Sequence, residues 1–424
     1  MKKAFCSLFF FSLFLPGFGQ TTYLHCGKVI DGLANTAQNQ MTLIIEGKTI
    51  AEIRKGYAPA PAGVTVVDLK DKTVMPGLMD AHVHLSSETS KTAYSDKFTL
   101  NEEDYAFRSV NYAERTLLAG FTTVRDLGGT TTLALRNAIN GGYIKGPRIL
   151  AAGKSIATTG GHADPTNGVS RKLMEDPSAK EGVINSPEEA RKAVRQRYKE
   201  GADVIKITAT GGVLSNAKDG AGAHFTEEEI RAVVTTAKDY GYKVAAHAHG
   251  AEGMKRAIRA GVTSIEHGTF MDDEAISLMK KHGTYYVPTI TAGKSVADSA
   301  KIPGYYPPFV VVKAVETGPK IQATFTRAYK AGVKIAFGTD AGVFGHGKNH
   351  KEFEYMVEGG MPPMAAIKSA TVVAADRLGL SDQLGSLQKG KLADVIAVDG
   401  DPLQDIKAMQ KVTFVMKEGK IYKQ

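Results

Sequence analysis

The chain has 424 residues, of which 43% are hydrophobic and 23% charged, with 45 glycines, 16 prolines and no tryptophan. This composition is typical of a globular protein with one large core and a smaller attached unit, and it excludes a disordered or fibrous chain. The formal net charge is +9, but the basic residues are spread over predicted helix faces and intermixed with glutamate, so we expect no binding of nucleic acid.

The first twenty residues have a composition of their own. Lys2 and Lys3 precede an apolar run from Ala4 to Leu15, which is followed by a proline and small residues. This pattern predicts a secretory signal peptide over residues 1–20. The run is shorter than the roughly 20 apolar residues that a membrane span needs, and a buried N-terminal helix is the alternative. We therefore expect a periplasmic or secreted protein that makes no membrane contact once the signal is removed.

Short strands dominate both ends of the mature chain. They are predicted over residues 23–30, 41–45, 49–53 and 64–69, and again over 392–398, 412–417 and 420–422. Glycine, proline and asparagine separate them. We expect residues 21–75 and 381–424 to pair into one small discontinuous β-sandwich. Cys26 loses its only possible partner when the signal, with Cys6, is removed, so it is predicted to be a buried strand residue.

Residues 76–380 alternate short apolar strands with amphipathic helices. The predicted strands cover residues 78–85, 122–127, 148–152, 204–209, 243–249, 263–267, 285–289 and 334–339. The predicted helices include residues 102–119, 187–200, 227–240 and 251–260. Eight β–α units in about 300 residues predict an α/β fold with a parallel (β/α)8 TIM-like barrel. An open doubly wound sheet fits the periodicity too, but it fits the placement of the polar residues less well.

Two histidines lie at the carboxyl end of the first of these strands, in Asp80-Ala81-His82-Val83-His84. Alternation along a strand places His82 and His84 on one face, and barrel enzymes build their sites at this end of the strands. Two imidazoles directed at one point favour a metal ion over a pair of core histidines.

Other strands also end in residues of the types that bind metals. These residues are His247 and His249 on the fifth strand, His267 on the sixth and Asp340 on the eighth. Together with the first pair they predict a ring of nitrogen and oxygen donors suited to zinc, for which manganese or cobalt could substitute. Alternation puts His247 and His249 on the same face, so it does not say which of the two is a ligand.

A lysine interrupts the apolar fourth strand, Val204-Ile205-Lys206-Ile207-Thr208. An ammonium group among isoleucines inside a barrel is costly, and it would repel nearby metal ions. Carboxylation by carbon dioxide would convert Lys206 into an anionic carbamate whose two oxygens could bridge two ions. The alternative is a neutral or salt-bridged core lysine.

This set of motifs resembles the amidohydrolase superfamily. Within it, the chain is similar to the imidazolonepropionase-like binuclear dipeptidases, the Xaa-Pro and Xaa-Arg/Lys group. The matching runs are residues 76–85, 122–129, 204–214, 245–250, 265–268 and 337–342. With the predicted sandwich, the resemblance covers nearly all of the mature chain.

The resemblance implies two divalent metal ions, zinc by default, and a possible set of ligands for them. His82, His84 and Asp340 would bind the buried ion, His247 and His267 would bind the second, and Lys206 as N6-carboxylysine would bridge the two. His249 would then lie beside the ligands. Barrels of this family commonly associate, so the resemblance also makes a homo-oligomer possible.

The reaction implied by the resemblance is hydrolysis of the amide bond of a dipeptide or N-acyl amino acid. Two metal ions lower the pKa of a shared water, which then acts as hydroxide near neutral pH. Asp340 would take a proton from this water and later pass it to the leaving amine. His162, in Thr159-Gly160-Gly161-His162 after the third strand, matches a family position close to the substrate; an ordinary loop histidine is the alternative.

One position departs from the family pattern. Many of the related dipeptidases carry a substrate-contacting tyrosine where this chain has Phe225, which has no hydroxyl. This region, with residues 270–272 and 283–288, is more similar to bacterial amidohydrolases that cleave ochratoxin A, an N-acyl phenylalanine. Carboxypeptidase activity on a substrate with an aromatic acyl group is therefore expected beside dipeptidase activity.

The main alternative function is hydrolysis of a cyclic amide or imine, as in imidazolonepropionases. Those enzymes usually work with one metal ion and lack the lysine of the fourth strand, so Lys206 counts against this function. A barrel that has lost catalysis is a second alternative, but such a protein would be expected to lose ligands. No Gly-x-Ser-x-Gly elbow supports a serine hydrolase.

Several residues near the strand ends have more than one interpretation. Arg125 could bind a substrate carboxylate or form an internal ion pair that closes the barrel. His346 and His350 could contact substrate at the rim or be solvated loop residues. Tyr285 and Tyr286 are predicted to belong to the barrel core.

Overall fold

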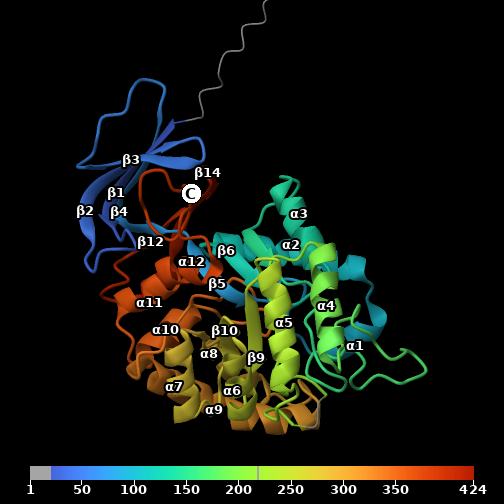
Figure 1. Cartoon of the computed structure of the whole chain (residues 1–424). Helices are drawn as coiled ribbons and strands as arrows, with labels where there is room; N and C mark the ends of the chain where they lie inside the picture. Colours follow the sequence, from blue (N-terminus) through green and yellow to red (C-terminus); the bar gives the residue numbers. More distant parts are fainter. Residues whose placement is uncertain (1–20, 217–218) are drawn as a thin grey trace, which may run out of the picture.

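The computed structural model describes residues 21–216 and 219–424, so the predicted signal peptide over residues 1–20 lies outside the described residues. A sheet built from both chain ends lies at the upper left of Figure 1, above a larger α/β body. Within the described ranges, no helix combines the length and the apolar character that a membrane crossing requires.

The smaller part is one seven-stranded sheet to which both chain ends contribute. Its strands are β1 (Thr21–Val29), β2 (Gln38–Glu46), β3 (Thr49–Lys55), β4 (Thr65–Pro76), β12 (Val395–Asp399), β13 (Val412–Lys417) and β14 (Lys420–Lys423). They lie in the order β14-β13-β12-β4-β1-β2-β3, with β1 and β4 parallel and the other neighbours antiparallel. The chain ends therefore pair as predicted, whereas a division into two packed sheets stays a prediction.

Strand β4 is longer than the sequence pattern indicates. The apolar alternation stops at Leu69, but the backbone continues to Pro76 because this second half pairs with β12, with Val395 opposite Pro76. Cys26 on β1 is fully buried, and burial raises the pKa of its thiol to about 12. The prediction of a buried strand residue is confirmed.

The α/β body contains two parallel sheets. The first has the order β5 (Leu78–Val83), β6 (Phe121–Asp126) and β7 (Arg148–Ala151), and the second runs from β8 (Ile205–Thr208) through β9 (Val244–Ala248) and β10 (Ser264–His267) to β11 (Tyr285–Val287). Nearly every residue of these strands is buried, as expected for parallel strands that are covered on both faces.

Isolated bridges extend both parallel sheets at their edges. Ile156 bridges Ile207 of β8, and Ile335 bridges Tyr286 of β11. Ala341 bridges Val83 of β5. The predicted eighth strand, residues 334–339, thus forms an isolated bridge instead of a regular strand. Its ladder is interrupted because the Phe337 N–H donates to Ser369 O, outside both sheets.

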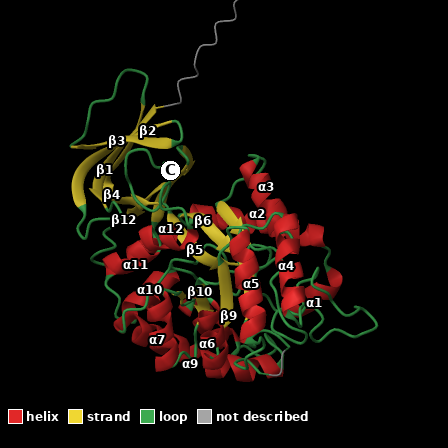
Figure 2. Ribbon diagram, viewed as in Figure 1, coloured by secondary structure: helices red, strands yellow, loops and turns green. Residues whose placement is uncertain are grey.

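Helices surround these strands (Figure 2). They are α1 (Ala93–Thr99), α2 (Glu102–Leu118), α3 (Thr132–Asn140), α4 (Pro187–Glu200), α5 (Glu227–Asp239), α6 (Ala251–Ala260), α7 (Asp273–His282), α8 (Ile290–Ser299), α9 (Pro308–Lys330), α10 (Lys351–Glu358), α11 (Pro363–Ser369) and α12 (Val372–Leu378), with a 3-10 turn η1 (Ile406–Gln410). The Ser186 and Thr226 side chains cap α4 and α5, and left-handed Gly201 and Gly261 end α4 and α6. These four helix ends follow the usual capping chemistry.

Candidate active site

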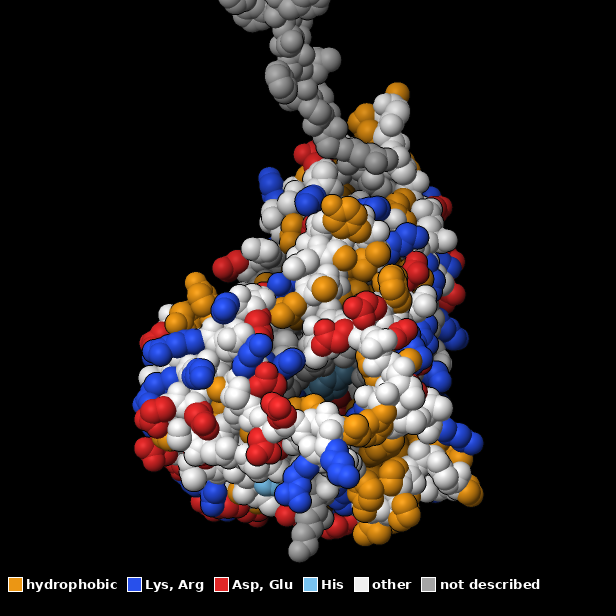
Figure 3. All heavy atoms as spheres, turned by 90° about the vertical axis from the view of Figure 1, so that its right-hand side faces the viewer, with side chains coloured by type: hydrophobic (Ala, Val, Ile, Leu, Met, Phe, Trp, Pro, Cys, Tyr) orange, Lys and Arg blue, Asp and Glu red, His pale blue; other side chains and the backbone are white. Residues whose placement is uncertain are grey.

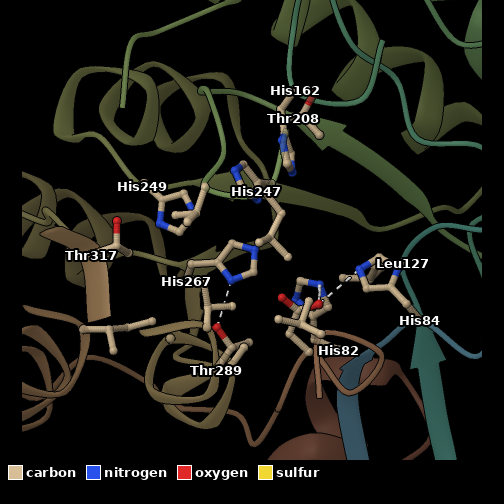
Figure 4. A pocket seen from close by; sticks show the side chains of 18 of the residues that line it. His82, His84, Leu127, His162, Thr208, His247, His249, His267, Thr289 and Thr317 are labelled. Atoms are coloured by element: carbon tan, nitrogen blue, oxygen red, sulfur yellow. Dashed lines mark hydrogen bonds and ion pairs between the residues drawn. The ribbon is translucent and has the colours of Figure 1, made fainter. Parts of the chain in front are cut away.

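A cavity of about 210 Å³ lies at the carboxyl ends of the parallel strands. Its lining includes His82, His84, His162, Lys206, His247, His249, His267 and Asp340. The space-filling view shows histidine atoms, in pale blue, at the bottom of a hollow (Figure 3). In the close-up, the imidazoles from different strands point toward a common centre (Figure 4). The structure thus brings together every site residue predicted from the sequence.

His82, His84 and Asp340 form a compact group that could hold a metal ion. One ligand atom from each lies within 4.8 Å of the other two. Asp340 Oδ1 is 3.2 Å from His84 Nε2 and 3.5 Å from His82 Nε2. Nitrogen and carboxylate oxygen atoms at such spacing match the donor set that zinc and similar ions prefer.

The hydrogen bonds of these imidazoles show that a cation fits between them. His84 Nδ1 donates to Gly128 O, and His82 Nδ1 donates to the Glu266 carboxylate, each at a distance of 3.0 Å. Each Nε2 therefore directs a lone pair at Asp340 Oδ1, which is buried and has no hydrogen-bond donor among the described residues. A proton on one imidazole would satisfy one of these two contacts, whereas a divalent ion could bind all three atoms.

The protonation tendencies of the two imidazoles differ. Burial lowers the pKa of His82 to about 4. Burial also acts to lower the pKa of His84, but the Asp340 carboxylate outweighs it and the net pKa is raised. A neutral His82 is ready to act as a ligand without first losing a proton.

A second group of histidines lies across the cavity. The ring centroids of His247 and His267 are 4.6 Å apart, and those of His249 and His267 are 5.0 Å apart. His247 Nε2 donates to Gly211 O, so its Nδ1 carries the free lone pair. His249 uses its Nδ1 to bond Thr269 Oγ1, so its Nε2 remains available. Both therefore keep a nitrogen for a ligand, and the choice between them stays open.

Lys206 lies between the two groups. Its side-chain Nζ is 3.5 Å from His82 Nε2, and the residue is 4% exposed. Burial lowers the pKa of its ammonium to about 8, although the carboxylates of Glu266 and Asp340 oppose this effect. The neutral amine, which is the form that reacts with carbon dioxide, is therefore more accessible near neutral pH than in an exposed lysine.

His162 reaches the cavity from the loop after β7. Its ring stacks on that of His247, with 4.2 Å between centroids and 23° between planes. The lack of a side chain at Gly212 leaves room for the His162 ring, since a Cβ at residue 212 would lie 2.1 Å from His162 Nδ1. That Nδ1 is buried without a partner among the described residues, and burial lowers its pKa to about 3. A neutral imidazole with an unused nitrogen therefore lines the cavity.

A buried ion pair resolves the two interpretations of Arg125. Its guanidinium contacts Glu266 at 2.9 and 3.1 Å, and its Nε donates to Ala81 O. Arg125 is 1% exposed and does not line the cavity. It is therefore an internal ion-pair residue that holds Glu266, and Glu266 in turn orients His82.

The backbone is strained at three residues of the site. His267, Thr289 and Asp340 have φ values of 70°, 50° and 61°, which non-glycine residues rarely adopt. Buried Glu352 stabilises one of these turns, because its carboxylate accepts hydrogen bonds from the N–H groups of Ile290 and Thr291. Thr289 Oγ1 then bonds His267 Nδ1 at 2.8 Å, which orients this imidazole.

Contacts also decide between the interpretations of the other residues near the strand ends. His346 is 3% exposed, and its Nε2 donates to Ser87 O, so it is a buried structural histidine. His350 precedes α10 and does not line the cavity. Tyr286 is fully buried and donates to His267 O, whereas Tyr285 is half-buried and bonds Asp376. Phe225 is 1% exposed and packs in the core, away from the cavity.

The apolar wall of the cavity was not predicted from the sequence. It is formed by α8 and α9, with Ala292 and Val296 on the first helix and Ala314 and Ile321 on the second. Two close-packed glycines, Gly293 and Gly318, let the helices approach. The only sequence signal was a run of small residues at helical spacing, which also occurs in ordinary helix packing.

The α/β body and its cluster of histidines, lysine and aspartate define a hydrolytic enzyme site. The chain belongs to the amidohydrolase family, whose sequence profile matches residues 73–422. Among curated proteins, it is 34% identical to an ochratoxinase of Aspergillus niger, over 95% of this chain and 87% of that protein. An imidazolonepropionase of Fusobacterium nucleatum is 25% identical, over 88% of each chain.

Solved structures show the same relationship. A Xaa-Pro dipeptidase with methionine bound in its active site is 53% identical, with a TM-score of 0.93 over 96% of this chain and 100% of that chain. The crystal structure of A. niger ochratoxinase is 31% identical, with a TM-score of 0.83 over 95% and 96% of the two chains. The chain is therefore a hydrolase with the fold of this family, and its neighbours support amide hydrolysis.

Proposed function

We propose that this hydrolase cleaves the amide bond of dipeptides or N-acyl amino acids and releases the C-terminal amino acid. The observation that carries the proposal is the convergence of His82, His84 and Asp340 on one point, with Lys206 and a second histidine group facing them. Similarity to a Xaa-Pro dipeptidase and to an ochratoxinase supports the same class of bond.

The donor set fits two divalent ions, with zinc as the default. His82, His84 and Asp340 would hold one ion, and His247 and His267, with His249 as the alternative to His247, would hold the other. Lys206, carboxylated on its neutral amine, would lie between them. Bound ions would supply Lewis acidity, which polarises the amide carbonyl and lowers the pKa of the attacking water.

The side chains of the site divide the remaining work. Asp340 accepts a proton from the attacking water and passes it to the leaving nitrogen, so that one water is consumed for each acid and amine formed. His162 donates a hydrogen bond to the carbonyl oxygen as negative charge develops there. The apolar wall of α8 and α9 keeps bulk water away and contacts the side chain of the released amino acid.

The layout of the chain is part of the proposal. We infer that the edge bridges close the two parallel sheets into a (β/α)8 barrel over residues 76–380, with residues 334–339 as its eighth strand. Residues 21–75 and 381–424 form the attached β-sandwich. The protein acts alone or as a homo-oligomer on a small-molecule substrate.

The proposed cellular location rests on the predicted signal peptide over residues 1–20. Removal of residues 1–20 on export would place the enzyme in the periplasm or the medium. N-terminal sequencing of protein recovered from those fractions should begin near Thr21, and recovery of a chain that still begins with Met1 in the cytoplasm would contradict export.

Removal of metal should abolish the release of amino acids. The mature chain, prepared with zinc and bicarbonate, is mixed with dipeptides and N-acyl amino acids, ochratoxin A included, and released amino acids are followed by mass spectrometry. Release should fall to background in a chelator and return when zinc is added back, because the side chains alone cannot acidify the water.

Two results would count against this function. Release that continues in the chelator would exclude metal-dependent hydrolysis. No release from any member of the pool, with two metal ions measured per chain, would favour the cyclic amide hydrolysis of imidazolonepropionases. That alternative is the weaker one at present because Lys206 lies in the cavity and the imidazolonepropionase is only 25% identical.

A further inference from the structure

A second cavity of about 340 Å³ adjoins the first. The two share His84, Leu214 and Val343 in their linings, so they meet at these residues, and His84, one of the proposed metal ligands, lies at the junction. We call this second cavity the tyrosine chamber. A substrate whose amide bond lies at the junction has one half in each cavity.

Four tyrosines, Tyr94, Tyr105, Tyr112 and Tyr306, line the tyrosine chamber. Tyr94 is held by a hydrogen bond of 2.6 Å to Leu214 O, and Tyr112 is stacked on His346 with 4.9 Å between centroids. These walls are therefore fixed before a ligand binds. Fixed aromatic walls favour a flat aromatic group, which can stack or pack edge-to-face on them.

Tyr306 adds a polar feature to this aromatic surface. The residue is 8% exposed, and its buried hydroxyl has no partner in hydrogen-bond geometry among the described residues, although Thr89 and Ser299 lie near enough to interact with it. A buried hydroxyl without a good partner costs free energy, which a ligand oxygen could recover.

Among the described residues, the ion pairs in and around the tyrosine chamber leave one of its lining lysines unpaired. Glu88 is paired with Arg115 at 2.6 Å, and Asp96 is paired with Arg108 at 3.1 Å. Lys97 has no carboxylate within ion-pair distance in the described part of the chain, and its Nζ lies 5.4 Å from the centre of the Tyr94 ring. The unpaired lysine repels an ammonium group and attracts an anionic or oxygen-rich one.

The first cavity differs from the tyrosine chamber because one of its walls is apolar and uncharged. Its wall on α8 and α9 is built from small and aliphatic residues such as Val296, Ala314 and Ile321, and it carries no charged side chain. It fits an uncharged apolar side chain of moderate size. The two cavities therefore select different halves of a substrate.

We propose that the tyrosine chamber binds the acyl half of the substrate, and that this half is an aromatic acyl group bearing a polar or anionic oxygen. The apolar wall of α8 and α9 binds the side chain of the released amino acid. This inference rests on the proposed amide hydrolysis, and it makes the enzyme selective for N-acyl amino acids over dipeptides with a free N-terminal ammonium.

The test compares substrates that release the same amino acid. N-(4-carboxybenzoyl)-L-methionine, N-benzoyl-L-methionine and L-phenylalanyl-L-methionine are assayed with the zinc-loaded enzyme. We expect kcat/KM to fall in that order, with about a tenfold difference between the first and the last, because one aromatic contact and one charge contact each change binding by a few fold.

Variants of the tyrosine chamber should change this order. Lys97→Glu should lower kcat/KM for the carboxybenzoyl substrate and raise it for the free dipeptide, each by about threefold to tenfold. Tyr306→Phe should lower kcat/KM for the carboxybenzoyl substrate by about fivefold, with little effect on kcat/KM for the benzoyl substrate. Lys280→Glu, at the end of α7 away from the cavities, is the matched charge control and should leave all three values unchanged.

Three outcomes would overturn the inference. An unchanged order in Lys97→Glu and Tyr306→Phe would show that the acyl group lies elsewhere. A change in the preferred released amino acid, measured by replacing methionine with alanine or phenylalanine, would show that the chamber binds the other half. Faster hydrolysis of the free dipeptide by the unmodified enzyme would exclude the N-acyl preference. If none of the three substrates is hydrolysed, this result would instead contradict the proposed function itself.

Discussion

Asp340→Asn is expected to lower kcat by about a thousandfold while metal content stays near that of the unmodified enzyme. The amide keeps an oxygen at the Oδ1 position, which lies 3.2 Å from His84 Nε2, so the ligand contact survives. It cannot accept a proton at neutral pH, so water activation and protonation of the leaving amine both fail. Steady-state kinetics and metal analysis by mass spectrometry measure the two effects separately.

The backbone makes asparagine the suitable replacement at this position. Asp340 has a φ of 61°, and asparagine tolerates this left-handed conformation better than other residues with a side chain. Asp340→Ala is the comparison variant, because it removes the ligand oxygen and should lose metal as well as activity. A kcat near that of the unmodified enzyme in Asp340→Asn would exclude a proton-transfer role for this carboxylate.

The chemistry of the site could be predicted because the periodicity of a strand determines the face on which each side chain lies. A two-residue spacing along β5 places His82 and His84 on one face, and the carboxyl ends of parallel strands converge. Residues at the ends of other strands, such as His267 and Asp340, could therefore be grouped with them without knowledge of distances. The structure brings all of these side chains to one cavity.

Contacts between distant parts of the chain could not be predicted in the same way. Arg125 had two interpretations because its partner, Glu266, is 141 residues away and nothing local indicates the pairing. The tyrosine chamber combines Tyr94, Tyr105 and Tyr112 with Tyr306, which comes from a loop far along the chain. No periodic pattern relates such residues, so only the fold shows that they share a surface.

The eighth strand shows a different limit of sequence patterns. Residues 334–339 have the apolar composition of a buried strand, yet they form an isolated bridge at Ile335. Phe337 donates its N–H to Ser369 O, so part of the backbone pairing goes to the end of α11. Composition predicts an extended segment at this place, but which carbonyl accepts each hydrogen bond depends on the packing of the whole body.

Lys206→Ala is expected to reduce activity to background and to lower the metal content of the purified protein. The reason is that a carbamate on Lys206 would supply two ligand oxygens, which alanine cannot replace. Acetate or propionate added at high concentration should restore part of the activity, because the truncated side chain leaves room for a small carboxylate between the two histidine groups. Kinetics and metal analysis over a range of carboxylate concentrations measure the recovery.

Lys206→Met is the matched control for this rescue. Methionine removes the amine but fills much of the same space, so added carboxylate should not restore activity in this variant. Methionine would be well tolerated if Lys206 were only a core lysine, because a buried ammonium with no strong partner is costly. Full activity in Lys206→Met would therefore exclude a carbamate, whereas rescue confined to Lys206→Ala would support it.

The pH dependence of carbamate formation provides an independent check on the same residue. Burial lowers the pKa of Lys206 to about 8, so the neutral amine that reacts with carbon dioxide becomes more abundant as the pH rises toward this value. Metal-free enzyme exposed to the same dissolved concentration of ¹³C-labelled carbon dioxide should take up label faster at pH 8 than at pH 6, and Lys206→Met should take up none. Equal labelling of both proteins would place the carbamate on another amine and leave Lys206 as a structural residue of β8.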